Sequence, residues 1–192
     1  MYDAVQDIYC YEGTTVLKNV PDIHEQETLN EFEAAMTTQR SDEPLPSGDL
    51  DVAHYCAIHH HLFQDVYPWA GKFRTVRISK GGSAFCYPEN IEREMQILFD
   101  NLKNQDYLEG LSADEFATHA ARFLSTLNAI HPFREGNGRA QTSFLLLMAD
   151  YAGHPLNLDK LIPERFMEAM IASFEKDDGQ LTLELKRLVT HE

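Results

Sequence analysis

The sequence of 192 residues predicts an all-α fold, a helical bundle around a buried central helix, with one β-hairpin added. Apolar residues recur at helical spacing in several segments, as in residues 24–40. Residues 144–148 are apolar nearly all round, which is typical of a helix that is buried on every side. Two short β-prone runs flank the glycines at 81–82, and this pattern indicates a tight hairpin turn.

The first part of the chain is expected to form two helices. Residues 24–40 place Leu29 and Met36 on one helical face. Residues 41–48 contain two prolines and a glycine, which interrupt the helical pattern. A second helix is therefore expected over 49–66.

The hairpin is expected within residues 73–87. The runs 75–78 and 84–87 are β-prone and enclose a turn at Lys80-Gly81-Gly82. A two-stranded hairpin is marginal by itself, so it must lie on the helical body. Such an appendage can act as a lid or as a docking edge.

The remaining helices follow from local start and stop signals. Pro88 suits the first turn of a helix that runs to about Lys103. Ser112 and Glu115 form a capping box, after which an apolar face continues to Ile130. The central helix is expected from Gly138 to Tyr151, and Gly153-His154-Pro155 stops it. Two further helices are expected over 163–175 and 180–190.

Composition narrows the class of protein. The formal net charge is -15, and a binder of nucleic acid needs basic surface to displace counterions, so that class is disfavoured. No window is long and apolar enough to span a bilayer, and the N-terminus lacks the pattern of a signal peptide. The protein is therefore expected to be soluble and cytoplasmic. Cys10, Cys56 and Cys86 are too far apart to suggest a disulfide framework or a zinc site.

The segment that carries chemistry is 131–139, His-Pro-Phe-Arg-Glu-Gly-Asn-Gly-Arg. It precedes the central helix, and the N-terminus of a helix offers unpaired N–H groups to an anion. Arg139 lies in the first turn, where the helix dipole disfavours a cation, so we expect a bound anion beside it. The carboxylate of Glu135 next to that anion indicates an oligophosphate with magnesium. His131 has the titration range that suits a general base.

This segment resembles the signature of the Fic family, H-x-F-x-(D/E)-G-N-G-R-x-x-R, and matches it at every specified position from 131 to 139. The resemblance extends over nearly the whole chain. Residues 11–19 resemble the N-terminal segment of bacterial Fic proteins, residues 63–74 the segment before the flap, and residues 78–85 the flap itself. The resemblance therefore implies a single Fic domain over 1–192, and a stand-alone, toxin-like member of the family.

The resemblance also implies a protein adenylyltransferase, which moves AMP from ATP to a hydroxyl group of a target protein and uses Mg²⁺. In this reading His131 deprotonates the hydroxyl group, Glu135 holds the metal, and Phe133 anchors the loop. The hairpin aligns the target segment by strand addition, with Ile78 and Phe85 as docking residues. The expected nucleotide-binding residues are Lys80, Gly81, Arg134, Gly136, Asn137, Gly138 and Arg139.

Two features depart from the family pattern. The second arginine of the signature falls at position 142, where this chain has Thr142, so the contact of that arginine with the γ-phosphate is in doubt. Arg134 is a candidate substitute. The inhibitory pattern Ser/Thr-x-x-x-Glu followed by Gly or Asn is missing, and Ser173–Asp177 is only an approximate match. Inhibition would then come from a separate, antitoxin-like small protein. By analogy alone, the target is a subunit of a type II topoisomerase.

Several alternatives stay open. The same site can transfer another nucleotide or phosphate, although the phosphate-transferring variant of the family has lysine where this chain has Glu135. A catalytically silent nucleotide-binding or interaction module is a second alternative, favoured only by Thr142. The run His59-His60-His61 invites a metal site, but neighbouring residues of a helix do not face one another, so we interpret these histidines as structural.

Overall fold

The computed structural model describes residues 7–80, 83–174 and 177–190, which form helices and one short hairpin. The chain divides into two compact units. The first unit consists of residues 1–92 and 131–140, and the second of residues 93–130 and 141–192. Helices α3 (Pro88–Asn104) and α5 (Asn137–Tyr151) begin in the first unit and continue in the second. A single domain over 1–192 stays a prediction.

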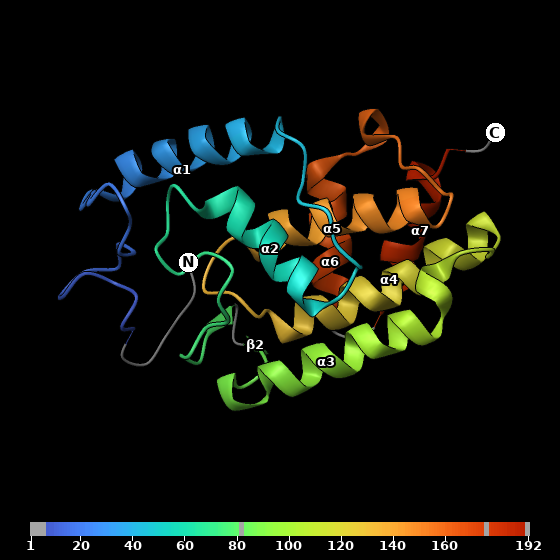
Figure 1. The fold of residues 1–192 in the computed structure, drawn as a ribbon, viewed down its shortest axis with the longest axis horizontal. Coiled ribbons are helices and arrows are strands. Elements are labelled where there is room, and N and C mark those ends of the chain that lie inside the picture. Colours follow the sequence, from blue (N-terminus) through green and yellow to red (C-terminus); the bar gives the residue numbers. More distant parts are fainter. Residues whose placement is uncertain (1–6, 81–82, 175–176, 191–192) are drawn as a thin grey trace. The chain divides into compact units, whose positions relative to one another are not determined.

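Helices α1 (Gln26–Ser41) and α2 (Val52–Phe63) pack against each other in the first unit, and Figure 1 shows them side by side. The carboxylate of Glu25 caps α1 by accepting hydrogen bonds from two backbone N–H groups of the first turn. Asp51 caps α2 in the same way. This cap and the turn after Phe63 make α2 shorter than the predicted range 49–66.

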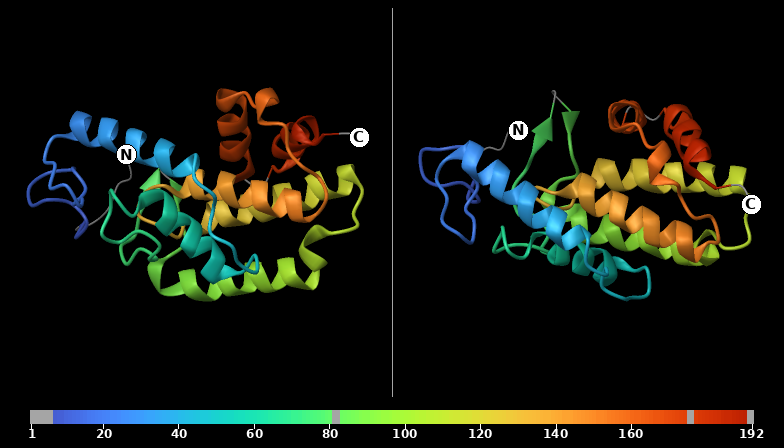
Figure 2. Two further views of the ribbon diagram at one scale, coloured as in Figure 1. Left: turned by 45° about the horizontal axis from the view of Figure 1, so that its top comes forward. Right: turned by 90° about the horizontal axis from the view of Figure 1, so that it is seen from above.

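The hairpin lies where the sequence predicts it, but its strands are short. Strands β1 (Ser79–Lys80) and β2 (Ser83–Ala84) pair antiparallel, as the right-hand view of Figure 2 shows. The side chain of Arg74 explains why the predicted runs 75–78 and 84–87 do not continue the ladder. Its guanidinium donates to the carbonyl oxygens of Val76 at 2.7 Å and Cys86 at 2.6 Å. A buried arginine thus joins the two arms where a longer sheet would use backbone pairs.

The second unit is built on α4 (Ala113–Ile130), α6 (Pro163–Phe174) and α7 (Gly179–Leu188), which pack on one another. The capping box at the start of α4 is confirmed, because Ser112 and Glu115 exchange side-chain to backbone hydrogen bonds. Two single turns of 3₁₀ helix, Asp106–Leu108 and Leu158–Lys160, were not predicted.

Phenylalanines from three helices form the centre of the second unit. Phe99 of α3 meets Phe123 of α4 and Phe144 of α5 edge-on, with ring centroids 5.4 and 5.3 Å apart. Phe144 and Met148 are fully buried, which confirms that α5 is a central helix of this unit. Helix α5 ends where Gly153 adopts a positive φ of 78° and the N–H of His154 donates to the carbonyl oxygen of Ala149. No helix among the described residues is long and apolar enough to cross a membrane.

Candidate active site

The loop that precedes α5 is closed by the side chain of Asn137. Its Oδ1 accepts from the N–H of Phe133 at 3.0 Å, and its Nδ2 donates to the carbonyl oxygen of Phe133 at 2.8 Å. The side-chain amide of Asn137 is buried and holds the loop. Binding of a phosphate by Asn137, which stays a prediction, therefore falls to its backbone N–H.

Phe133 anchors the loop by burying its whole side chain. Its ring stacks on the imidazole of His59 with centroids 3.7 Å apart, and it also stacks on Tyr55 at 5.4 Å. Both partners belong to α2. The loop is therefore held against this helix by aromatic packing as well as by hydrogen bonds.

His59 fixes the loop at a second point. Its Nε2 lies 3.0 Å from the carbonyl oxygen of Glu135, and its Nδ1 accepts from the N–H of Gly71 at 2.9 Å. Since Nδ1 accepts, Nε2 carries the proton and donates. Burial lowers the pKa of His59 to about 3, so the ring is neutral at physiological pH. Each histidine of the run contacts a backbone carbonyl oxygen, which supports the structural interpretation.

His59 should make the protein sensitive to acid. The unfolded chain protonates this histidine near pH 6.5, whereas the folded chain does so only near 3, so stability is lost as pH falls between these values. The slope from this one group approaches about 1.4 kcal/mol per pH unit. Urea unfolding from pH 7 to pH 4 should show a shallower slope for His59→Phe than for wild type. His60→Gln, at an exposed neighbour, is the control, and equal slopes for all three proteins would contradict the prediction.

His131, the predicted general base, lies at the start of the loop with a positive φ of 50°. Its ring stacks on Phe85 of the hairpin, with centroids 4.0 Å apart and 22° between the planes. Its carbonyl oxygen accepts from Nε of Arg74 at 2.8 Å, and the N–H of Arg74 donates to the carbonyl oxygen of Pro132 at 2.9 Å. Arg74 is only 1% exposed, and it ties the base of the hairpin to the catalytic loop.

Ile78 and Phe85 are interior residues in this structure, 3% and 9% exposed. Their side chains are therefore covered in this structure, and their role as docking residues stays a prediction. Substituting Asp for Phe85 would disturb its packing on His131 as well as any docking of a target. Docking by strand addition needs backbone groups rather than these side chains, and it stays a prediction. Gly81 lies outside the described residues, and Lys80 is an exposed residue of β1.

Arg139 projects from the first turn of α5 toward α1. Its Nη2 pairs with Oε1 of Glu33, and its Nη1 donates to Oγ1 of Thr37 at 2.9 Å. Its guanidinium lies 4.7 Å above the ring of Phe63. The sequence predicts a bound anion beside Arg139. In this structure the negative charge beside Arg139 is the carboxylate of Glu33.

The two glycines of the loop differ in their surroundings. Gly136 has a positive φ of 81°, and a Cβ there would overlap the ring of Phe63, so the loop requires glycine. A Cβ at Gly138 would meet no described atom within 4 Å. Gly138 is exposed at the start of α5, so a ligand can approach the helix N-terminus there.

Glu135 is half-buried beside this turn, and its Oε1 accepts from the N–H of Gly136 at 3.0 Å. Burial is the largest cause that raises the pKa of this carboxyl, and the nearby charge of Glu33 raises it further. A cation next to the carboxylate would favour its charged form. A lone carboxylate with room for phosphate oxygens and water suits the oxygen ligands that Mg²⁺ prefers.

Arg134 points elsewhere. Its Nε and Nη2 donate to Oδ2 of Asp7 at 2.8 and 2.5 Å, and the two side chains are only 5% and 12% exposed. A role for Arg134 in nucleotide binding stays a prediction, and it would require this buried ion pair to open.

Sequence reasoning missed several residues that support the site. They come from the N-terminal segment, from α1, from α2 and from the segment that leads to the hairpin. No spacing relates them to the loop, so only the folded chain could reveal their contacts. They are Asp7, Glu33, His59, Arg74 and Tyr67, whose hydroxyl group donates to Glu33.

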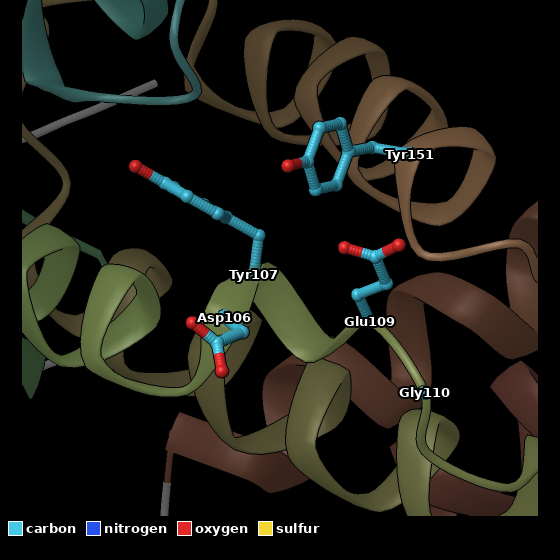
Figure 3. A pocket seen from close by; sticks show the side chains of 5 residues that line it. All are labelled: Asp106, Tyr107, Glu109, Gly110 and Tyr151. Carbon is cyan, nitrogen blue, oxygen red and sulfur yellow. The ribbon is translucent and has the colours of Figure 1, made fainter.

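A hollow elsewhere, in the second unit, is separate from this chemistry. It has a volume of about 430 Å³ and opens to solvent. Figure 3 shows Tyr107 and Tyr151 beside it, together with the carboxylates of Asp106 and Glu109. None of the predicted site residues lines it, so the candidate active site remains the loop at 131–139.

The family model described as Fic/DOC family matches residues 49–149, more than half of the chain. This chain belongs to the Fic/DOC family. The match runs from the start of α2 through the hairpin and the catalytic loop into α5. It includes His131, Glu135 and Arg139.

Relatives of this Fic protein are similar over its whole length. The probable protein adenylyltransferase y4lH of Sinorhizobium fredii is 51% identical, over 98% of each chain. The protein adenylyltransferase VbhT of Bartonella schoenbuchensis is 35% identical over 98% of this chain, which spans 40% of that protein. A crystal structure of BepC from Bartonella tribocorum, with bound AMPPNP, has a TM-score of 0.85 and 28% identity. That comparison covers 96% of this chain and 97% of the chain in the crystal structure.

Proposed function

We propose that this Fic protein is a protein adenylyltransferase that transfers AMP from ATP to a hydroxyl group of a target protein and releases pyrophosphate. The observation that carries the proposal is the loop at 131–139, in which His131, Glu135 and Arg139 adjoin the N-terminus of α5. The name protein adenylyltransferase borne by relatives at 51% and 35% identity supports it, and so does the ATP analogue bound by BepC.

The reaction follows from the residues of the loop. The imidazole of His131 takes the proton from the target hydroxyl group, and the oxygen attacks the α-phosphorus of ATP. The bond from that phosphorus to the bridging oxygen breaks, and pyrophosphate leaves with the electron pair. The backbone N–H groups of Asn137 and Gly138 hold the phosphates at the start of α5, and Gly136 lines the same turn while its N–H donates to Glu135. Arg139 stabilises the charge that develops on the leaving group.

We assign Glu135 as the ligand of a magnesium ion, because it is a carboxylate beside the expected phosphates. When bound, Mg²⁺ neutralises charge on the phosphate oxygens. Glu135 must be ionised to hold the metal. Because its pKa is raised, the carboxyl ionises at a higher pH than an ordinary glutamate does. The N–H of Gly136 keeps the carboxylate oriented.

The partner of the reaction is a protein that presents a Tyr, Thr or Ser hydroxyl group, aligned along the hairpin by strand addition. By analogy alone we propose a subunit of a type II topoisomerase, a cytoplasmic location, and inhibition by a small antitoxin-like protein. The absence of the second arginine of the signature, at Thr142, changes the residue that such an inhibitor would contact.

Incubation with ATP labelled at the α- or the γ-phosphate tests the proposal. Transfer of the α-label to proteins of a bacterial lysate, with no transfer of the γ-label, is expected. Transfer of the γ-label would indicate phosphate transfer, and transfer of neither label would indicate a silent binding module. Competition by the other nucleoside triphosphates decides the base preference.

Thr142→Arg should raise the rate of transfer. Position 142 lies three residues after Arg139 in α5, so an arginine at 142 would lie on the same face of the helix as Arg139. A charge-assisted hydrogen bond to a phosphate is worth about 1.5–3 kcal/mol, and a gain of about 1.4 kcal/mol in the transition state is tenfold in rate. Steady-state transfer at saturating ATP measures the effect. An unchanged or lower rate, with an intact circular dichroism spectrum, would show that the site operates without a second arginine.

A further inference from the structure

Helix α1 contributes an acidic side chain to the catalytic loop that the signature does not include. The carboxylate of Glu33 pairs with Arg139 through Oε1 and accepts from the hydroxyl group of Tyr67 through Oε2. We propose that Glu33 is a positioning residue, which holds the guanidinium of Arg139 so that its remaining donors face the departing pyrophosphate. This inference rests on the proposed transfer of AMP.

The hydrogen bonds leave Arg139 able to bind both groups at once. A guanidinium has five N–H donors in a rigid plane. Glu33 and Thr37 each take one of them, and the ring of Phe63 supports one face of the plane. The contacts with described residues leave three donors in a plane that is already oriented, and the side chain of Arg139 is 40% exposed. The ion pair therefore prepares Arg139 for a phosphate rather than excluding one.

A carboxylate is needed here because of where Arg139 lies. The first turn of a helix carries partial positive charge, which disfavours a cation and would let the side chain swing away. The side chain of Glu33 is 16% exposed, so its charge is little screened by solvent. The negative charge of Glu33 therefore offsets the partial positive charge of the α5 N-terminus at the position of Arg139.

Tyr67 keeps Glu33 in place. Burial, followed by the negative charge of Glu33, raises the pKa of Tyr67, so the hydroxyl group stays protonated and remains a donor. The chain Tyr67, Glu33, Arg139 thus runs from the segment before the hairpin, through α1, to the start of α5. Each member orients the next, and a misplacement of about 1 Å in such a chain can cost 10²-fold in rate.

A double-mutant cycle tests the proposal by steady-state AMP transfer at several ATP concentrations. Glu33→Ala should lower kcat by about 10–100-fold, with a smaller change in KM for ATP, because orientation affects rate more than affinity. In an Arg139→Ala background, Glu33→Ala should cause almost no further loss, since Glu33 acts through Arg139. Glu33→Gln keeps one acceptor oxygen for Arg139, and its NH2 group can donate to the hydroxyl oxygen of Tyr67, so this variant should recover part of the rate.

The control is Glu31→Ala, an exposed carboxylate of the same helix, which should transfer at the wild-type rate. Equal losses from Glu33→Ala in both backgrounds would assign Glu33 a purely structural role and overturn the proposal. A kcat/KM above the wild-type value in Glu33→Gln would also overturn the proposal, because the carboxylate of Glu33 would then compete with the phosphate for Arg139. Wild-type protein that transfers no α-label would instead reject the proposed function, whatever the variants do.

Discussion

His131→Ala should lower the rate of AMP transfer by about 10²–10⁴-fold and leave the affinity for ATP close to that of wild type. A general base contributes to the barrier of the chemical step rather than to ground-state binding. The ring of His131 is held by stacking on Phe85, so the base is oriented before the target arrives. Rates come from transfer of α-label to one target, and affinity from titration calorimetry with a non-hydrolysable ATP analogue.

The backbone at His131 calls for a second variant. With φ at 50°, alanine is strained there, whereas asparagine adopts this conformation more readily. His131→Asn removes the base with less disturbance of the loop and should be as slow as His131→Ala. Wild-type transfer by either variant would reject His131 as the base. If His131→Ala loses ATP binding but His131→Asn keeps it, backbone strain in the loop is the cause of the lost binding.

Glu135→Ala should abolish most of the transfer, and wild-type protein should need magnesium or manganese. Glu135 is the one ligand that we assign from the chain, so its loss removes the anchor of the metal. Glu135→Gln, which keeps the size and one oxygen, is the matched variant and should be rescued only partly by excess magnesium. Metal analysis of the purified protein should find no zinc.

Protonation of the same carboxyl adds a loss of rate on the acid side of the pH profile, beside the loss from protonation of the general base His131. Burial raises its pKa above the ordinary value of 4.5, so protonation removes the metal ligand at a higher pH than an exposed glutamate would. The rate should therefore fall as pH drops through this raised value, and Glu135→Gln should lack that limb. Full activity in excess chelator would contradict the assignment of Glu135.

Local patterns in the sequence were sufficient for the helices. The structure confirms three signals that depend on residues close together in the chain. They are the capping box at Ser112, the proline at 88 that begins α3, and the apolar run in α5. Local patterns failed for the hairpin strands. The buried guanidinium of Arg74 donates to carbonyl groups of both arms and also to the carbonyl oxygen of His131, far along the chain. No short-range pattern reveals this combination of contacts.

By itself, the sequence determined the order of the helices, the family signature and the identity of the loop residues. The tertiary structure decided what each loop side chain contacts. Asn137 closes the loop, Arg134 pairs with Asp7, and Arg139 pairs with Glu33 of α1. The physical reason is that periodicity and capping depend on residues within one or two turns, whereas a buried charge must find its partner wherever the folded chain brings one near.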